Sequence, residues 1–160
     1  AHAGGLVDVV VTNPDAQSGT LTNGYYYVPA PTATTWFPLT PCRVVDTRLA
    51  SGALGGPVLS ANQTRTFDVT TAPATCGIPS NAKSLTVNYT ITAAQQPGEL
   101  RAFAGDALWT GTSVISFKAG VTRANNGHLM LATGGAGTFQ VTNASAGTVH
   151  LILDVNGYYQ

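Results

Sequence analysis

The sequence predicts an all-β protein whose body is a β-sandwich. The chain is rich in Gly, Thr, Val and Ala and poor in Glu, Lys and Met, a usage typical of extended strands and tight turns. Residues 85–92 alternate apolar with polar side chains, the period-two pattern of a strand with one face in a core. Similar segments recur about every ten residues between glycine-containing turns, as in a sandwich or barrel. The expected core positions are Leu85, Val87, Tyr89, Ile91, Leu151 and Leu153.

Composition also excludes several classes of protein. A chain of 160 residues forms one ordinary domain, or one domain with an appendage. Only 9% of the residues are charged and the net formal charge is zero, whereas disordered segments are usually more charged and less apolar. The five Arg and two Lys form no basic stripe, so we expect no nucleic-acid partner. No run of about eighteen apolar residues occurs, so we expect no membrane span.

The N-terminal segment reads as three short strands. Residues 6–12 form the first, with β-branched side chains on both faces, and residues 13–16 turn the chain. Residues 19–22 form a second strand. Residues 23–24 are the dipeptide Asn-Gly, the signal of a type I′ turn, and a third strand follows at residues 25–28.

This segment, VDVVVTNPDAQSGTLTNGYYYVP, resembles the last strands of an immunoglobulin-like domain of the IPT/TIG type. The resemblance covers residues 6–29 and only the final third of such a domain, and two or three strands cannot bury both of their faces alone. The missing strands could come from the body of the same chain, from a second subunit or from a cleaved upstream fragment. The candidate interface residues are Leu6, Val7, Val9, Val10, Val11, Tyr25, Tyr26, Tyr27 and Val28.

We therefore divide the chain into partial Ig-like strands at residues 1–29, a Pro/Thr linker at 30–36 and a sandwich body at 37–160. The body is expected to be Ig-like or jelly-roll-like, with a long loop at residues 49–62 and no helix longer than two turns. Its strands are expected at residues 43–46, 65–70, 85–92, 99–104, 112–117, 128–132, 138–142 and 148–155.

Two cysteines indicate the compartment. Neither Cys42 nor Cys76 belongs to a CxxC motif, so a zinc site or redox pair is not expected. A disulfide of a secreted protein is favoured over two buried free thiols. Closing a loop of about 34 residues would stabilise the fold by about 4 kcal/mol in the chain-entropy model. We expect an extracellular or cell-surface protein.

The body also resembles a second type of domain. Its motifs TPCRVVDTR, GIPSNAKSLTVNYT, PGELRAFAG, TSVISFKAGVTRANN and GTVHLILDVNGYY are similar to an uncharacterised β-domain appended to secreted bacterial proteins. The match spans residues 41–159. The resemblance implies a bacterial appendage and no catalytic residues.

The polar candidates favour structural roles. Asp46 and Arg48 lie two apart at a strand end, and a catalytic Asp is conceivable, but a charge pair that pins a loop is the better interpretation. His150 is expected on a solvated strand face. We expect no catalytic residues, no metal ligands and no cofactor.

Sequons and aromatic residues raise the possibility of glycans. Asn62, Asn88 and Asn143 each begin an N-x-S/T sequon, and a glycan at Asn88 would leave the outward face of its strand. Trp36, Trp109 and residues 25–27 could stack on sugar rings, although such residues are more often core or interface anchors.

The leading hypothesis is a non-enzymatic extracellular structural protein, a subunit of a surface fibre assembled by donation of the N-terminal strands. Its partners would be identical subunits joined head to tail, with glycans as further candidates. The alternative is a carbohydrate-binding or adhesive module of a larger secreted enzyme.

Overall fold

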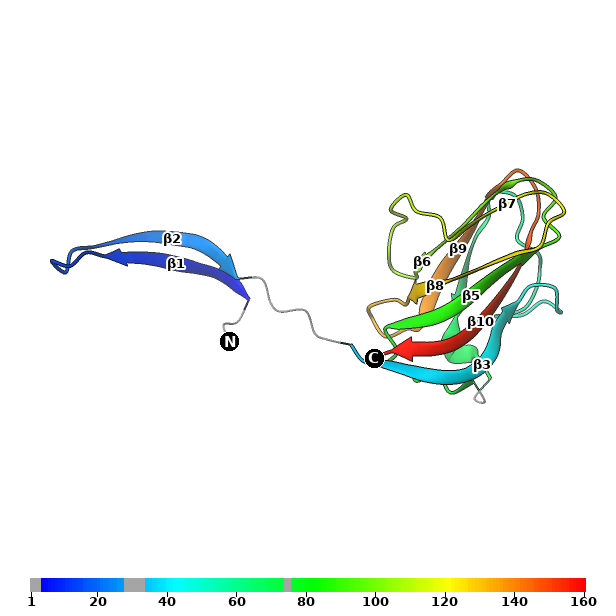
Figure 1. Cartoon of the computed structure of the whole chain (residues 1–160), viewed down its shortest axis with the longest axis horizontal. Coiled ribbons are helices and arrows are strands. Elements are labelled where there is room, and N and C mark those ends of the chain that lie inside the picture. The colour runs from blue at the N-terminus through cyan, green and yellow to red at the C-terminus, as the bar shows by residue number, and fades with distance from the viewer. Residues whose placement is uncertain (1–3, 28–33, 74–75) are drawn as a thin grey trace. The chain divides into compact units, whose positions relative to one another are not determined.

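The computed structural model describes residues 4–27, 34–73 and 76–160. The chain divides into two compact units, residues 1–33 and 34–160. The described part of the first unit is one antiparallel hairpin, β1 (Gly5–Thr12) and β2 (Ser18–Tyr27) (Figure 1). Its turn lies where the sequence predicts one: Asn13 N–H donates to the Gln17 carbonyl at 2.8 Å, and Ala16 N–H donates to the Asn13 carbonyl at 2.9 Å.

The turn predicted at Asn23 and Gly24 is wrong, because β2 continues through both residues. Val7 pairs with Tyr25 and Val9 with Leu21, so the single residue between them on β1 faces three residues of β2. Asn23 takes a φ of 55° there, a left-handed conformation that Asn tolerates better than most residues. The dipeptide therefore makes a bulge inside one strand, and the hairpin has two strands instead of three.

The body consists of two four-stranded antiparallel sheets, which confirms the predicted all-β sandwich (Figure 1). The first sheet has the order β3 (Trp36–Asp46), β10 (His150–Tyr159), β5 (Ser84–Thr92) and β8 (Arg123–Met130). The second has the order β4 (Thr64–Asp68), β9 (Thr138–Ser145), β6 (Gly98–Ala104) and β7 (Ile115–Phe117). We refer to them as the β3–β8 sheet and the β4–β7 sheet.

The core lies between the two sheets. All six predicted core side chains are buried, and the most accessible of them are 1% exposed. The β4–β7 sheet contributes Phe67 and Phe139, whose rings stack with centroids 5.4 Å apart, together with the fully buried Leu100 and Val141. Alternation in the strands therefore identified the core correctly, since residues on one face of a strand share one environment.

Several strand boundaries differ from expectation because pairing partners extend the strands. Trp36, expected in the linker, begins β3 and pairs with Tyr159. Strand β8 begins at Arg123, before any apolar alternation, because its backbone pairs along β5 as far as Ile91. Strand β7 is shorter than expected, at Ile115–Phe117.

The expected strand at residues 65–70 ends early. β4 stops at Asp68, whose carboxylate accepts from the Thr70 N–H at 2.8 Å and caps the 3₁₀ helix η1 (Val69–Thr71). Within the described ranges, no helix is long and apolar enough to cross a membrane.

Candidate functional site

The N-terminal hairpin, β1 and β2, carries apolar side chains on both of its faces. Successive residues of a strand point to opposite faces, and paired residues share a face. The pairs Val7 with Tyr25 and Val9 with Leu21 therefore lie on one face, and the pair Leu6 with Tyr26 lies on the other. The most exposed apolar side chains of the hairpin, each between 56% and 64% accessible, are Leu6, Val10, Val11, Leu21, Tyr25 and Tyr26.

The structure brings eight of the nine candidate interface residues together on this hairpin, and Val28 lies outside the described residues. Tyr25 and Tyr27 pack edge to face, with ring centroids 4.9 Å apart. Leu21 was not among the candidates, yet it pairs with Val9 on the face that holds these tyrosines. Its position two residues before the Asn-Gly dipeptide concealed it, because the expected turn would have separated it from Tyr25.

A bulge fixes the register of the hairpin. The Asn23 N–H donates to Asp8 Oδ1 at 2.7 Å. A Cβ added to Gly24 would lie 2.8 Å from the Leu21 side chain and 3.0 Å from the Leu21 carbonyl oxygen, so any other residue at that position would displace the Leu21 side chain. The bulge therefore keeps Tyr25 and Leu21 on one face of the ribbon.

A two-stranded ribbon has two open edges and no core of its own. Each outer edge presents backbone N–H and C=O groups that can pair with another strand. Chemically, the hairpin can thus add two strands to a sheet and at the same time insert apolar side chains on both sides of it.

The body contains the predicted disulfide between Cys42 and Cys76, with Cα atoms 5.4 Å apart. Cys42 belongs to edge strand β3, and Cys76 follows the 3₁₀ helix. The bond therefore ties the connection between β4 and β5 to the edge of the β3–β8 sheet.

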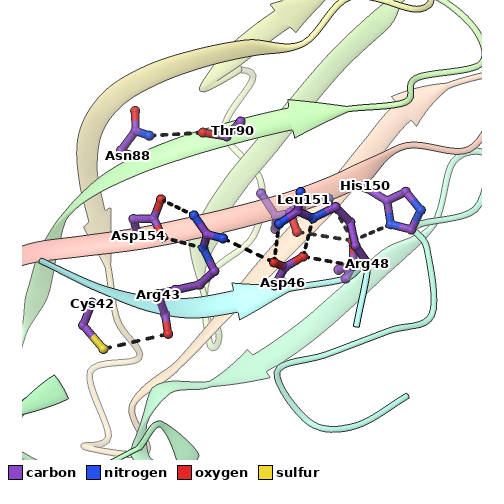
Figure 2. A network of polar contacts seen from close by, with 10 residues as sticks. Cys42, Arg43, Asp46, Arg48, Asn88, Thr90, His150, Leu151 and Asp154 are labelled. Atoms are coloured by element: carbon purple, nitrogen blue, oxygen red, sulfur yellow. Dashed lines mark hydrogen bonds and ion pairs between the residues drawn. The ribbon is translucent and has the colours of Figure 1, made fainter. Parts of the chain in front are cut away.

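Asp46 and Arg48 form the predicted charge pair at the end of β3 (Figure 2). Arg48 Nε donates to Asp46 Oδ1 at 2.8 Å, its terminal nitrogen donates to Oδ2 at 2.7 Å, and its backbone N–H donates to Oδ1 at 3.1 Å. The Arg48 side-chain hydrogen bonds lower the pKa of the buried Asp46 carboxyl to about 2, against the opposing effect of burial. An ionised carboxylate that accepts three bonds from one loop residue pins the loop.

A second ion pair beside it was not predicted. Arg43 Nε donates to Asp154 Oδ1 at 2.8 Å and its terminal nitrogen to Oδ2 at 3.3 Å, which links β3 to β10 (Figure 2). The two residues are 111 positions apart, so only the strand pairing brings them together. His150 was expected on a solvated strand face. Its ring is instead half-buried, and its Nδ1 lies 3.1 Å from the Thr47 hydroxyl.

The three sequons lie in different environments. Asn62 is exposed with a φ of 55°, and Asn88 is half-buried, with its amide donating to Thr90 Oγ1 at 3.1 Å. Asn143 is fully buried, and its Nδ2 donates to the carbonyls of Leu59, Ser60 and Gly147 at 3.2, 2.9 and 2.8 Å. N-glycosylation attaches sugar to this nitrogen, so the burial and hydrogen bonds of Asn143 disfavour the glycan expected there.

The two tryptophans lie on the body. The Trp109 indole N–H donates to the Thr112 carbonyl at 2.8 Å, and the Arg101 guanidinium covers its ring at 3.8 Å. The Trp36 indole N–H donates to Thr86 Oγ1 at 3.0 Å. Across the described parts of the chain, no group of three or more His, Cys, Asp or Glu side chains could hold a metal ion.

No family model and no curated protein matches this chain. Among solved structures, it is similar to the coat protein of Tobacco streak virus in a C2 crystal form, with a TM-score of 0.44 and 12% identity over 84% of this chain and 91% of that chain. It is also similar to the Tobacco streak virus coat protein dimer, with a TM-score of 0.44 and 16% identity over 82% and 89% of the two chains. Neither likeness indicates what this chain does.

Proposed function

We propose that this chain is a non-enzymatic extracellular structural protein whose copies join through the N-terminal hairpin into a surface fibre. The observation that carries the proposal is the exposure of apolar side chains on both faces of β1 and β2. Burial of apolar surface contributes about 25 cal/mol per Å², so a hairpin with two apolar faces gains stability when both are covered.

Donation of the hairpin to a neighbouring subunit would cover both faces and pair an open edge. Main-chain hydrogen bonds would give affinity, and alternate side chains in the neighbour's core would give specificity. The donated hairpin and the site that accepts it are different surfaces, so the contact is heterologous, and copies add head to tail until a ring closes or a fibre grows. We propose the open fibre.

The disulfide and two sequence resemblances support the extracellular setting. The Cys42–Cys76 bond belongs to an oxidising compartment. The resemblance of residues 41–159 to a domain of secreted bacterial proteins agrees with it, as does the resemblance of residues 6–29 to the closing strands of an IPT/TIG domain.

The test compares the full chain with three variants by light scattering and negative-stain electron microscopy. The full chain should form large species or filaments, and deletion of residues 1–29 should leave a soluble monomer. Leu21→Lys places a charge on an apolar face and should also stop assembly, whereas Gln17→Lys in the exposed turn should not. If the full chain is a monomer at high concentration with Tyr25 to Tyr27 protected from solvent, its own chain covers the apolar faces of the hairpin, and the proposal fails.

A further inference from the structure

A half-exposed indole ring, that of Trp36, packs against the outward face of the β3–β8 sheet. Thr86 alternates with the buried Leu85 and Val87, so it points away from the core, and its hydroxyl accepts the Trp36 indole N–H. Beneath the ring lies Gly157, where an added Cβ would come within 2.5 to 2.9 Å of three indole atoms. Trp36 is nevertheless 46% exposed. The ring therefore packs against the Gly157 backbone and leaves nearly half of the residue exposed.

Hydrogen-bonding side chains surround this ring on the same face. His128 pairs with Thr86 across the neighbouring strand and is exposed, and its ring meets Tyr159 edge to face with centroids 5.4 Å apart. The next outward row of the sheet, roughly 7 Å farther along the strands at two residues per row, holds two amides beside an ion pair. Its members are Asn88, Asn126, Asp154 and Arg43.

The charges on this face cancel in pairs. Arg43 binds Asp154 in a two-pronged contact, Arg48 does the same with Asp46, and a 3.5 Å ion pair between Arg43 and Asp46 joins the two pairs (Figure 2). A face with paired charges offers donors and acceptors without a net field for an ion. A ligand that suits it is uncharged, with hydroxyls at its edge and an apolar surface for the half-exposed indole.

We propose that this face, defined by Trp36, Thr86, Asn88, Asn126, His128 and Gly157, binds a neutral polysaccharide chain. The C–H groups of one pyranose ring would pack on Trp36, because aromatic faces carry negative charge density and bury apolar surface efficiently. Hydroxyls of the next sugar would bond to His128 and the two amides. Such a division between apolar platform and few polar groups is usual in ligand sites.

The geometry of Trp36 distinguishes it from the other candidate aromatic residue of the body. Trp109 already has a partner on its ring, the Arg101 guanidinium at 3.8 Å. Both indole N–H groups are hydrogen-bonded and both residues are nearly half-exposed, but Trp109 lies in the connection between β6 and β7 of the other sheet, outside the proposed face. Trp109 is therefore the matched control for a stacking role of Trp36.

The test uses the disulfide-bonded 160-residue chain from a host that does not modify sequons, so that Asn88 carries no glycan. Cellohexaose and mannohexaose are titrated separately by isothermal calorimetry and by saturation-transfer NMR, with an acidic hyaluronan hexasaccharide for comparison. At least one neutral hexasaccharide should bind, and Trp36→Ala should weaken that binding at least about tenfold. Trp109→Ala should leave it unchanged.

Gly157→Ala gives a second variant in case Trp36→Ala does not fold. It keeps the indole but pushes it off the sheet, so binding should fall as with Trp36→Ala while circular dichroism stays that of a β protein. Failure of both neutral sugars to bind, tighter binding of hyaluronan, or equal loss with Trp109→Ala would overturn the proposal. Trp36 fluorescence that responds to protein concentration and to neither sugar would also overturn it, and would mark the face as a contact between subunits.

Discussion

The backbone N–H of Asn23 and the carboxylate of Asp8 are joined by a 2.7 Å hydrogen bond across the N-terminal hairpin. This bond holds the bulge that keeps Leu21 and Tyr25 on one apolar face. Asp8→Ala removes the acceptor, whereas Asp8→Asn keeps an oxygen in the same place. We expect amide hydrogen exchange at Asn23 to speed up about tenfold in Asp8→Ala, since a lost bond costs about 1 kcal/mol or more. Asp8→Asn should exchange much as the native chain does, and equal exchange in all three would contradict a role for the bond.

The Asp46–Arg48 pair predicts how stability depends on pH. The pKa of Asp46 falls from an ordinary value of 3.8 to about 2 in the fold. A lowered pKa stabilises the fold fully above pH of about 4, and this contribution disappears as pH falls through 2. It amounts to at most about 2 kcal/mol, less any screening by solvent around the half-exposed Arg48.

Urea unfolding between pH 5 and 2 measures this contribution. The native chain should lose stability more steeply than Asp46→Asn, and Arg48→Met should also be shallower than the native chain, although the Arg48 backbone N–H and Arg43 still contact Asp46. Arg65→Met is the control, because its guanidinium donates to the Gly52 and Pro57 carbonyls, and its slope should match that of the native chain. Parallel slopes for all four proteins would show that the pair has no pH-dependent role.

The disulfide should make a large contribution to the stability of the body. It closes a separation of 34 residues, for which the chain-entropy model gives about 4 kcal/mol. The double variant Cys42→Ser and Cys76→Ser should lose about that much in urea unfolding, and reductant should destabilise the native chain but not the variant. A thiol assay on unfolded, unreduced protein should find no free thiol, and two reactive thiols would contradict the bond.

Burial predicts which sequon stays bare. Peptides from the native source that contain Asn143 should have their sequence mass, whereas Asn62 and Asn88 remain candidates for glycans. Asn143→Ala removes three hydrogen bonds to backbone carbonyls and should cost about 3 kcal/mol in unfolding free energy.

Asn62→Gly is the matched control for Asn143→Ala. Asn62 is exposed and has a φ of 55°, a conformation that glycine adopts freely. The unfolding free energy of the Asn62→Gly variant should stay within about 0.5 kcal/mol of the native value. Equal losses for the two variants, or glycan on the Asn143 peptide, would contradict the buried role of Asn143.

Local sequence patterns were enough to predict those features of the protein that depend on one property repeating along one segment. The alternation around Leu85 and Leu151 identified the core, because a strand with one buried face alternates apolar and polar residues along its sequence. The pairing of Cys42 with Cys76 also followed from number and compartment. By contrast, Asn23 and Gly24 carry the signal of a tight turn, and only the pairing of β2 with β1 shows that the same conformation serves a bulge.

The sequence by itself thus determined an all-β chain, its core strands and its disulfide. The strands follow from side-chain periodicity, and the disulfide follows from the presence of two cysteines. Tertiary structure alone decided which polar side chains from distant segments meet. The pairing of β3 with β10 places Arg43 beside Asp154. The same pairing places Trp36 against Gly157. It also decided that the sequon at Asn143 faces the core while that at Asn62 faces solvent. Such outcomes depend on strand order and register between segments far apart in the chain, which no local pattern encodes.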